Sequence, residues 1–422
     1  MLIISYIALC LLFIVYLYTL SVRIEGKIIN VMVPYLIITV PTLYVFEGIF
    51  VYLSEVQNYT VEYLFFYTCY ITYIASFVIS YLYTQRKPIY NKSNTKNKPR
   101  YVFTSLLFTF LAFIIYLPVL MEFREYILSP RRIYELTRTG YGIYFYPSLM
   151  FSLVASICAF FTYKKSKLFC ISIVLFNCIL IFLHGNKGPI FSIFIAFILY
   201  LSYIENKKIK FMFLVKSFAV IAVIVTAFFA YTFTDGNPIE NMANYSDYTR
   251  NAVLVASSNF DFMYGKLLME SEVYSRIPRA IWPDKPEDFG ALYLAKVFFP
   301  DAFYRNQGAP AFGYGELYAD FGLFTPVWLV ISGVFKGVLA KYFSNKTQET
   351  KSAHYFIMFL FCIGISVIPV SMGWLFPEHL MIAFMVYIAS SFVFSEHIRF
   401  VLLRTINKLY GGNAAVLFGS EA

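Results

Sequence analysis

The sequence predicts an all-α polytopic membrane protein, and three observations carry this prediction. The chain has 422 residues, of which 59% are hydrophobic and only 14% are charged, whereas soluble domains have about 25% charged residues. Its apolar residues come in runs near 20 residues, the length at which a helix crosses a bilayer core of about 30 Å. The runs do not alternate apolar and polar residues, as the strands of a membrane barrel would.

About eleven transmembrane helices are expected, with one large loop between the eighth and the ninth. Helices one to eight occupy residues 1–233, the large loop 234–324, helices nine to eleven and a cytoplasmic end 325–410, and a tail 411–422. The loop is the longest stretch without a membrane-length apolar run. The expected spans are Ile3–Leu20, Ile28–Phe46, Tyr63–Thr84, Val102–Met121, Tyr144–Tyr163, Leu168–Leu183, Ile190–Ile204, Phe211–Phe233, Thr325–Phe343, Tyr355–Met372 and Leu380–Ser395.

The Lys and Arg residues of the short loops predict the orientation. Cytoplasmic loops of membrane proteins carry an excess of Lys and Arg, and residues 85–101 hold several of both with no acid. Alternation of the spans places the other basic loops on the same side and residues 234–324 on the outer side, with the C-terminus in the cytoplasm. The net charge of +10 is thereby explained by topology, so nucleic acid is not an expected partner.

A group of basic residues marks the large outward loop. Arg276, Arg279 and Lys285 lie within ten residues of one another and are separated by prolines, which stiffen the backbone. With Arg250 and Arg305 they are candidates for binding a diphosphate, because the planar guanidinium makes paired bonds to phosphate oxygens. The alternatives are contact with lipid headgroups or ion pairs within the loop. The nearby acids are Asp284, Glu287 and Asp288.

Two short outward turns carry further candidates. Lys187 lies in the glycine-containing turn 184–189, where it could meet a lipid phosphate or extend its ammonium to the headgroups. His379 follows Glu378 in the turn 373–379 and is a candidate acid or base, with a solvated loop charge as the alternative.

The end of the large loop carries paired carboxylates and aromatic rings. Glu316 and Asp320 are four residues apart and share one face if this segment is helical. Glu316 is the candidate base for a sugar hydroxyl, and Asp320 could bind hydroxyls. Trp282, Tyr314 and Tyr318 could stack on sugar rings, or belong to the aromatic belt of a membrane interface. The sequence holds no cluster of His and Cys, so no metal site is expected.

Ionisable residues are scarce within the expected spans. Lys336 is the deepest of them, and it lies about two turns from the cytoplasmic end of its span, so its side chain can extend to that surface. Intramembrane charges commonly mark ion or proton paths. Their scarcity argues against an ion-coupled transporter.

Two motifs of the large loop resemble those of a known family. The segment Arg-Ile-Pro-Arg-x-x-Trp-Pro-x-Lys-Pro at 276–286 and the segment Gly-Tyr-Gly-Glu-Leu-Tyr-x-x-Phe-Gly at 313–322 resemble the Wzy-type O-antigen polymerases. The turn at 185–188 is similar too, although that family often has Arg where this chain has Lys187. The similarity of topology covers nearly the whole chain, and that of the motifs mainly residues 270–322.

The resemblance implies a GT-C-like membrane glycosyltransferase of the bacterial plasma membrane that works without a metal. It would act at the outer face on undecaprenyl-diphosphate-linked oligosaccharides, as donor and acceptor, and build O-antigen, the polysaccharide of lipopolysaccharide, or a similar surface polymer. A flippase and a chain-length regulator are the partners that this implies. The loop cations would stabilise the leaving diphosphate, with Glu316 as the base and His379 as the runner-up.

Three other functions remain open at the level of sequence. An O-antigen ligase has similar architecture and leaving-group chemistry but another acceptor. A flippase or exporter of lipid-linked sugars would share the membrane and the substrate, but would more naturally carry charges within its spans. A non-enzymatic receptor is less favoured, because no soluble interaction domain is recognisable.

Overall fold

A computed structural model describes residues 2–54, 57–84, 100–137, 140–185, 188–208, 212, 247–258, 260–277, 279, 281–306, 310–366 and 377–391. The described residues form helices and no β-strand. Six of these helical stretches are long and apolar enough to cross a membrane. The prediction of an all-α membrane protein is therefore confirmed, whereas the number of eleven spans stays a prediction. The expected span 211–233 lies outside the described residues except for Met212.

The helices fall into three classes by length and composition. The six long stretches are α1 (Leu2–Glu25), η1 with α2 (Tyr35–Phe46, Glu47–Leu53), α3 (Thr60–Tyr83), α4 (Tyr101–Glu122), α6 (Gly142–Phe160) and α15 through η4 to α16 (Gly315–Phe321, Gly322–Phe324, Thr325–Thr350). The shorter apolar helices are α7 (Lys167–Leu183), α8 (Gly188–Tyr203), α17 (Ala353–Cys362) and α18 (Pro377–Ser390). The remaining short helices are η2 (Gln57–Tyr59), η3 (Arg124–Tyr126), α5 (Pro130–Leu136), α11 (Tyr248–Ser257), α12 (Lys266–Tyr274), α13 (Ala291–Phe298) and α14 (Pro300–Asn306).

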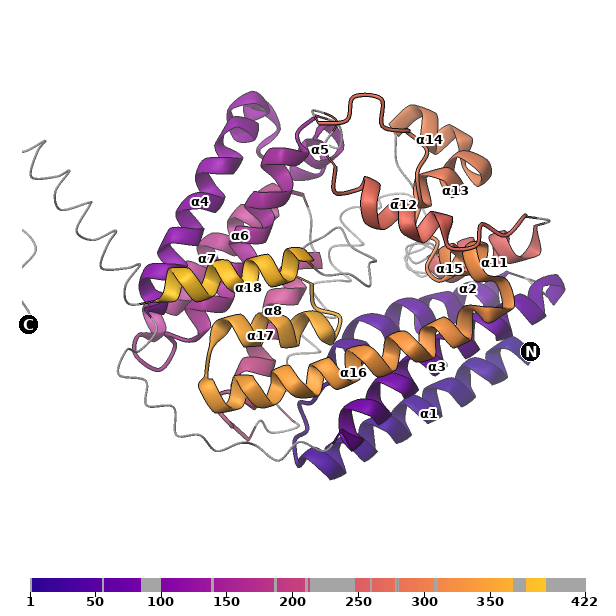
Figure 1. Ribbon diagram of the computed structural model, residues 1–422, viewed down its shortest axis with the longest axis horizontal. Helices are drawn as coiled ribbons and strands as arrows, with labels where there is room; N and C mark the ends of the chain where they lie inside the picture. Colours follow the sequence, from indigo (N-terminus) through magenta and orange to yellow (C-terminus); the bar gives the residue numbers. More distant parts are fainter. Residues whose placement is uncertain are drawn as a thin grey trace, which may run out of the picture.

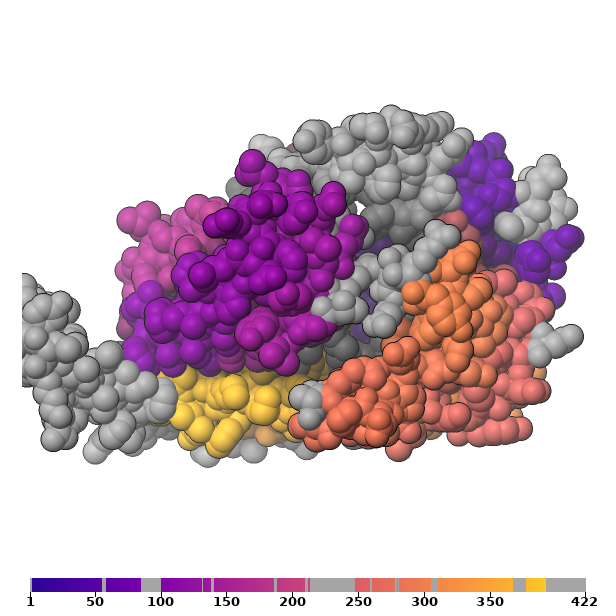
Figure 2. Space-filling model, turned by 90° about the horizontal axis from the view of Figure 1, so that it is seen from above, coloured from indigo at the N-terminus to yellow at the C-terminus, as the bar shows by residue number. Residues whose placement is uncertain are grey.

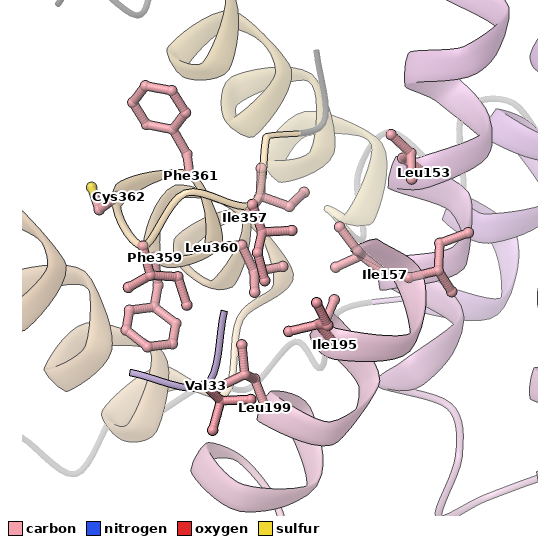
Figure 3. Close-up of a cluster of buried hydrophobic side chains, with 14 of the residues drawn as sticks. Val33, Leu153, Ile157, Ile195, Leu199, Ile357, Phe359, Leu360, Phe361 and Cys362 are labelled. Atoms are coloured by element: carbon pink, nitrogen blue, oxygen red, sulfur yellow. The ribbon is translucent and has the colours of Figure 1, made fainter. Parts of the chain in front are cut away.

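The long helices form two bundles joined by shorter ones. In Figure 1, α1, α3 and α16 run side by side at one side of the molecule, and α4, α6 and α7 pack together at the other. Helix α17 packs on both α16 and α6. Figure 3 shows its side chains Ile357 and Leu360 among those of α6 and α8, with Val33 beside them. This apolar cluster joins the two bundles.

The second expected span begins later than the sequence predicts. Residues 28–32 are apolar but irregular in structure, and Met32 is fully buried. The buried Asn30 side chain accepts a hydrogen bond from the Met32 N–H at 2.9 Å and so satisfies a backbone donor without a helix. Pro34 stands at the start of the helix, where its missing N–H costs nothing. Pro41 lies inside the helix, which takes the wider π form over Tyr35–Phe46.

The described part of the large loop is helical rather than irregular. Helices α11 to α15 lie together beside the end of the first bundle in Figure 1. They share a small apolar core of their own, formed by Val255, Leu267, Leu294, Ala295, Phe303, Phe312 and Ala319. This core holds α11 to α15 together as one compact unit, which we call the cap.

Described parts of three short basic loops lie against one another. Lys27 Nζ donates to Asn206 Oδ1 at 3.4 Å, and Lys164 Nζ lies 2.6 Å from a Glu205 carboxylate oxygen. The start of α4 meets the start of α17 through a bond from Ala353 N–H to the Tyr101 hydroxyl, 2.9 Å. These contacts join segments that are far apart in sequence.

Candidate functional site

A cavity of about 410 Å³ lies between η1, α3, α15 and α16. Its walls are mainly apolar and aromatic. Three ionisable side chains of acidic or basic residues line it: Glu316, Asp320 and Lys336. The aromatic residues of the wall are Tyr35, Tyr70, Tyr73, Tyr248, Tyr314 and Trp328.

Glycines position the motif at 313–316 against this cavity. Gly313 has φ of +53°, a conformation that favours glycine, and a Cβ there would lie 3.1 Å from the Tyr248 carbonyl oxygen. A Cβ on Gly315 would lie 2.8 Å from the Ala252 Cα. Helix α15 can therefore lie directly on α11, and both Tyr314 and Glu316 line the cavity.

Glu316 has no hydrogen-bond or ion-pair partner among the residues that the structure describes. Its side chain is half-buried at the cavity wall. Lys336 lines the same cavity from α16. A carboxylate with free oxygens in a largely apolar cavity can accept a proton from a bound hydroxyl, which is the chemistry predicted for Glu316.

Asp320 is engaged in the fold. Its two carboxylate oxygens accept the backbone N–H groups of Leu267 at 3.0 Å and Leu268 at 2.8 Å, at the start of α12. The side chain therefore satisfies two donors that a helix leaves unpaired at its N-terminus. The predicted role in sugar binding remains a prediction, and the geometry adds a structural role.

Replacement of Asp320 tests this structural role. Asp320→Ala leaves two N–H groups of α12 without acceptors, and we expect it to lower the free energy of unfolding by about 1–2 kcal/mol. Asp320→Asn retains one acceptor oxygen and should lose less. Thermal unfolding of the purified protein in detergent measures both. Equal stability of Asp320→Ala and the parent would contradict the capping role.

The three predicted sugar-binding rings have different surroundings. Tyr314 lines the cavity, with its ring centroid 4.8 Å from that of Tyr70. Tyr318 packs between α3 and the cap, and its ring centroid lies 5.4 Å from that of Phe65. Trp282 packs edge-on to Tyr274 at 5.0 Å, outside this cavity. Of the three, Tyr314 is the ring that the fold brings to Glu316.

Arg276 connects the cap to helix α18. Its guanidinium forms ion pairs with Glu272 at 2.6 Å and with Glu378 at the start of α18. Burial alone would lower the pKa of Arg276, but hydrogen bonds to Glu378 and Glu272 raise it above its ordinary value. Figure 2 shows the yellow α18 and the salmon cap helices along the same edge of the molecule. The partners thus differ from the nearby acids that the sequence suggested.

Arg250 is held against the first bundle. Its Nε lies 3.2 Å from Glu47 Oε2, and its guanidinium lies over the Phe50 ring, 3.7 Å from the centroid. Glu47 is buried and also accepts a hydrogen bond from the Tyr63 hydroxyl at 3.0 Å. This ion pair attaches α11 to the end of η1.

Arg279 and Lys285 come together at a second, smaller cavity of about 160 Å³, which Glu287 also lines. Arg279 donates to the carbonyl oxygens of Lys285 and Pro286, at 2.7 and 3.3 Å. Lys285 Nζ donates to the carbonyl oxygen of Ile277 at 2.9 Å. Burial, and secondarily the charge of Arg279, lower the pKa of Lys285. Both cations thus stabilise the proline-rich turn in this conformation.

Two predicted cations have no described side chain. Lys187 lies outside the described residues, and Arg305 is described only as part of the backbone of α14. The neighbouring His184 is buried against Tyr116, with ring centroids 3.7 Å apart, and burial lowers its pKa to about 4. His184 is therefore neutral at physiological pH and adds no charge to the turn.

His379, the second candidate base, is fully buried. Its Nε2 lies 2.9 Å from the Ser366 hydroxyl, and its ring packs on Phe361 at 3.8 Å between centroids. It does not line the cavity of Glu316. In this conformation Glu316 is the better placed of the two candidates.

Lys336 is a residue of this cavity that the sequence interpretation did not name as a site residue. It lines the cavity, and its Nζ lies 5.6 Å from the centroid of the Phe361 ring. That its side chain can extend to the nearer membrane surface stays a prediction. The available signal was its charge in an apolar helix, which commonly marks a functional site.

No known family model matches this chain, and no solved structure matches it.

Proposed function

We propose that this chain polymerises undecaprenyl-diphosphate-linked oligosaccharide repeat units into O-antigen or a similar surface polysaccharide. The observation that carries the proposal is the apolar, aromatic cavity with Glu316 at its wall, a carboxylate without a partner among the described residues. Part of that wall is the segment 313–322, which resembles the polymerase family. A lipid-linked sugar needs both an apolar surface and a group that accepts a proton, and this cavity offers both.

The proposed step is a glycosyl transfer without a metal. The acceptor hydroxyl oxygen forms a bond to the anomeric carbon of the donor, and the bond from that carbon to the diphosphate oxygen breaks. The hydroxyl proton passes to Glu316, and the electron pair leaves with the diphosphate. Loop cations would stabilise the charge that grows on the leaving group.

The cations need an exchange of partners for this role. Arg250 and Arg276 hold carboxylates, and Arg279 holds two backbone carbonyls. A diphosphate would have to displace these groups, and Arg276 is the most suitable candidate because its carboxylate partner Glu378 is partly exposed, whereas Glu47, the partner of Arg250, is buried. We therefore propose that the Arg276–Glu378 pair opens when substrate binds.

This proposal predicts different effects for the two partners. Arg276→Ala should lower polymer formation about 10²- to 10³-fold, the usual loss for one transition-state donor. Glu378→Gln removes the competing charge and should keep most of the activity. Polymer length and amount on a glycolipid gel measure both, with gel filtration as the control for folding. Equal losses in the two variants would show that Arg276 acts only by holding α18.

We also propose the finer topology that this function requires. In it, eleven helices cross the bacterial plasma membrane, residues 234–324 face the exterior and the C-terminus lies in the cytoplasm. The contacts among the short basic loops support this orientation, because Lys and Arg concentrate on the cytoplasmic side. The donor and acceptor would reach the cap from the outer leaflet, and a flippase and a chain-length regulator are the partners proposed.

The first experiment is the glycolipid profile of a deletion strain, beside the same strain that carries the parent gene or Glu316→Gln. Surface glycans with a single repeat unit in the deletion strain, and a ladder restored only by the parent, support the polymerase. Polymer that stays on the prenyl lipid indicates a ligase instead. Repeat units that accumulate at the cytoplasmic face indicate a flippase.

One observation favours the flippase as a second candidate. Lys336 and Glu316 place opposite charges at the wall of one cavity, and charges lining a cavity among membrane helices are typical of transport paths. Reconstituted protein in vesicles that hold labelled lipid-linked sugars distinguishes the two functions. Translocation without elongation would support the flippase and contradict the polymerase.

A further inference from the structure

Lys336 lies in α16, among residues that face lipid or the core. Its side chain is half-buried, and its described surroundings include the Phe361 ring but no acid within ion-pair distance. A charge within an apolar helix is costly unless it is paired or reaches water. A bound anion at this position would supply the missing partner.

The cavity has the size and the wall of a site for part of an amphiphile. Ligand sites commonly measure about 300–1,000 Å³ and are mainly apolar, with few polar groups. At about 410 Å³, the cavity can hold a phosphate with a short length of chain, but not a whole lipid-linked oligosaccharide. Ile38 lines the cavity and is 39% exposed, so part of the cavity wall lies at the outer surface of the protein.

We infer that this cavity binds an amphiphile with a phosphate head group, with Lys336 as the counter-ion of the phosphate. The chain of the amphiphile lies along the apolar residues of η1 and α16, such as Leu43 and Leu329. Glu316, in the same cavity, lies where it can meet hydroxyl groups of a ligand. The choice of a prenyl chain rests on the proposed function, whereas the role of Lys336 rests on the cavity.

The cavity contains its own reporter for a binding experiment. The chain has three tryptophans, and Trp328 lines the cavity. Replacing Trp282 and Trp374 by Phe leaves Trp328 as the single emitter. The probes are farnesyl monophosphate, farnesol, dihexanoyl phosphatidic acid and inorganic phosphate, added to the full chain in detergent. Gel filtration of every variant checks that it is folded.

The expected result is tight binding of farnesyl monophosphate that depends on the charge at 336. Lys336→Met, which keeps the length of the side chain, should weaken this binding about tenfold or more, because a hydrogen bond to a charged group is lost. Lys336→Arg should bind nearly as the parent does. Farnesol should bind the parent and Lys336→Met equally, and more weakly than the phosphate ester binds the parent.

The other probes distinguish the source of the phosphate. Binding of phosphatidic acid that also depends on Lys336 supports the inference and adds bilayer lipid as an occupant. Inorganic phosphate that binds as tightly as the farnesyl ester would overturn the role of the apolar wall. Lys336→Met that binds the ester as well as the parent would overturn the inference.

The inference and the proposed function fail separately. If the ligand binds in a way that depends on Lys336, but deletion of the gene leaves the glycan ladder intact, the binding site is supported and the polymerase function is contradicted. If the glycan ladder depends on the gene, but Lys336→Met does not affect binding, the polymerase function is supported and the phosphate of its substrate binds at another site.

Discussion

Glu316→Gln is expected to reduce polymer formation about 10²- to 10⁴-fold, the range that a positioned general base contributes. The substitution keeps the size of the side chain and its place at the cavity wall, but an amide cannot take a proton from an acceptor hydroxyl. Elongation of purified lipid-linked repeat units by the reconstituted protein measures the rate directly. The loss should lie in kcat, because the proton moves only in the chemical step.

Matched variants separate this role from others. Glu125→Gln makes the same chemical change at an exposed site outside the cavity and should leave the rate unchanged. Glu316→Asp keeps the carboxylate and should retain part of the rate. A base at 316 also predicts that the parent loses activity as the pH falls, and that Glu316→Gln lacks this dependence. An amide variant with the full rate would exclude Glu316 as the base.

Much of the helical fold can be predicted from the sequence, because bilayer thickness sets the length of an apolar helix. The prediction failed at 28–32, where the residues are apolar enough for a span but form an irregular, largely buried segment. Hydropathy reports only that a segment avoids water. It does not distinguish a helix from a buried chain whose donors are satisfied by a side chain such as Asn30.

The candidate site could be predicted only in part, for a related reason. Local spacing brought Glu316 and Asp320 together, since both lie on α15 and line one cavity. The spacing of residues along the sequence does not predict ion pairs between distant segments. Arg276 therefore has Glu378 as a partner, about a hundred residues away, in addition to Glu272, and neither was among the acids that the sequence suggested. Lys336 was not named as a site residue because its neighbours across the cavity come from other helices.

The closest packing of two long helices predicts the largest effect on stability. Helix α16 presents Gly333 and Gly337, four residues apart, to Ser76 and Ser80 of α3. A Cβ on Gly333 would lie 2.8 Å from the Tyr73 carbonyl oxygen, and a Cβ on Gly337 would overlap the Ser80 hydroxyl and the Phe77 carbonyl. Small residues at this spacing let membrane helices approach closely, and packing is a main source of their association.

Gly337→Ala is therefore expected to lower the free energy of unfolding by about 1–3 kcal/mol, and Gly337→Leu to prevent folding, because the backbone of α3 cannot move aside as a side chain can. Thermal unfolding by gel filtration in detergent measures both. Val338→Leu adds bulk at the next residue, which is 40% exposed, and should unfold like the parent. Ser80→Ala should restore part of the loss in Gly337→Ala, since it removes one of the two groups that overlap. If Gly337→Leu unfolds at the temperature of the parent, α3 and α16 are not packed as closely as described.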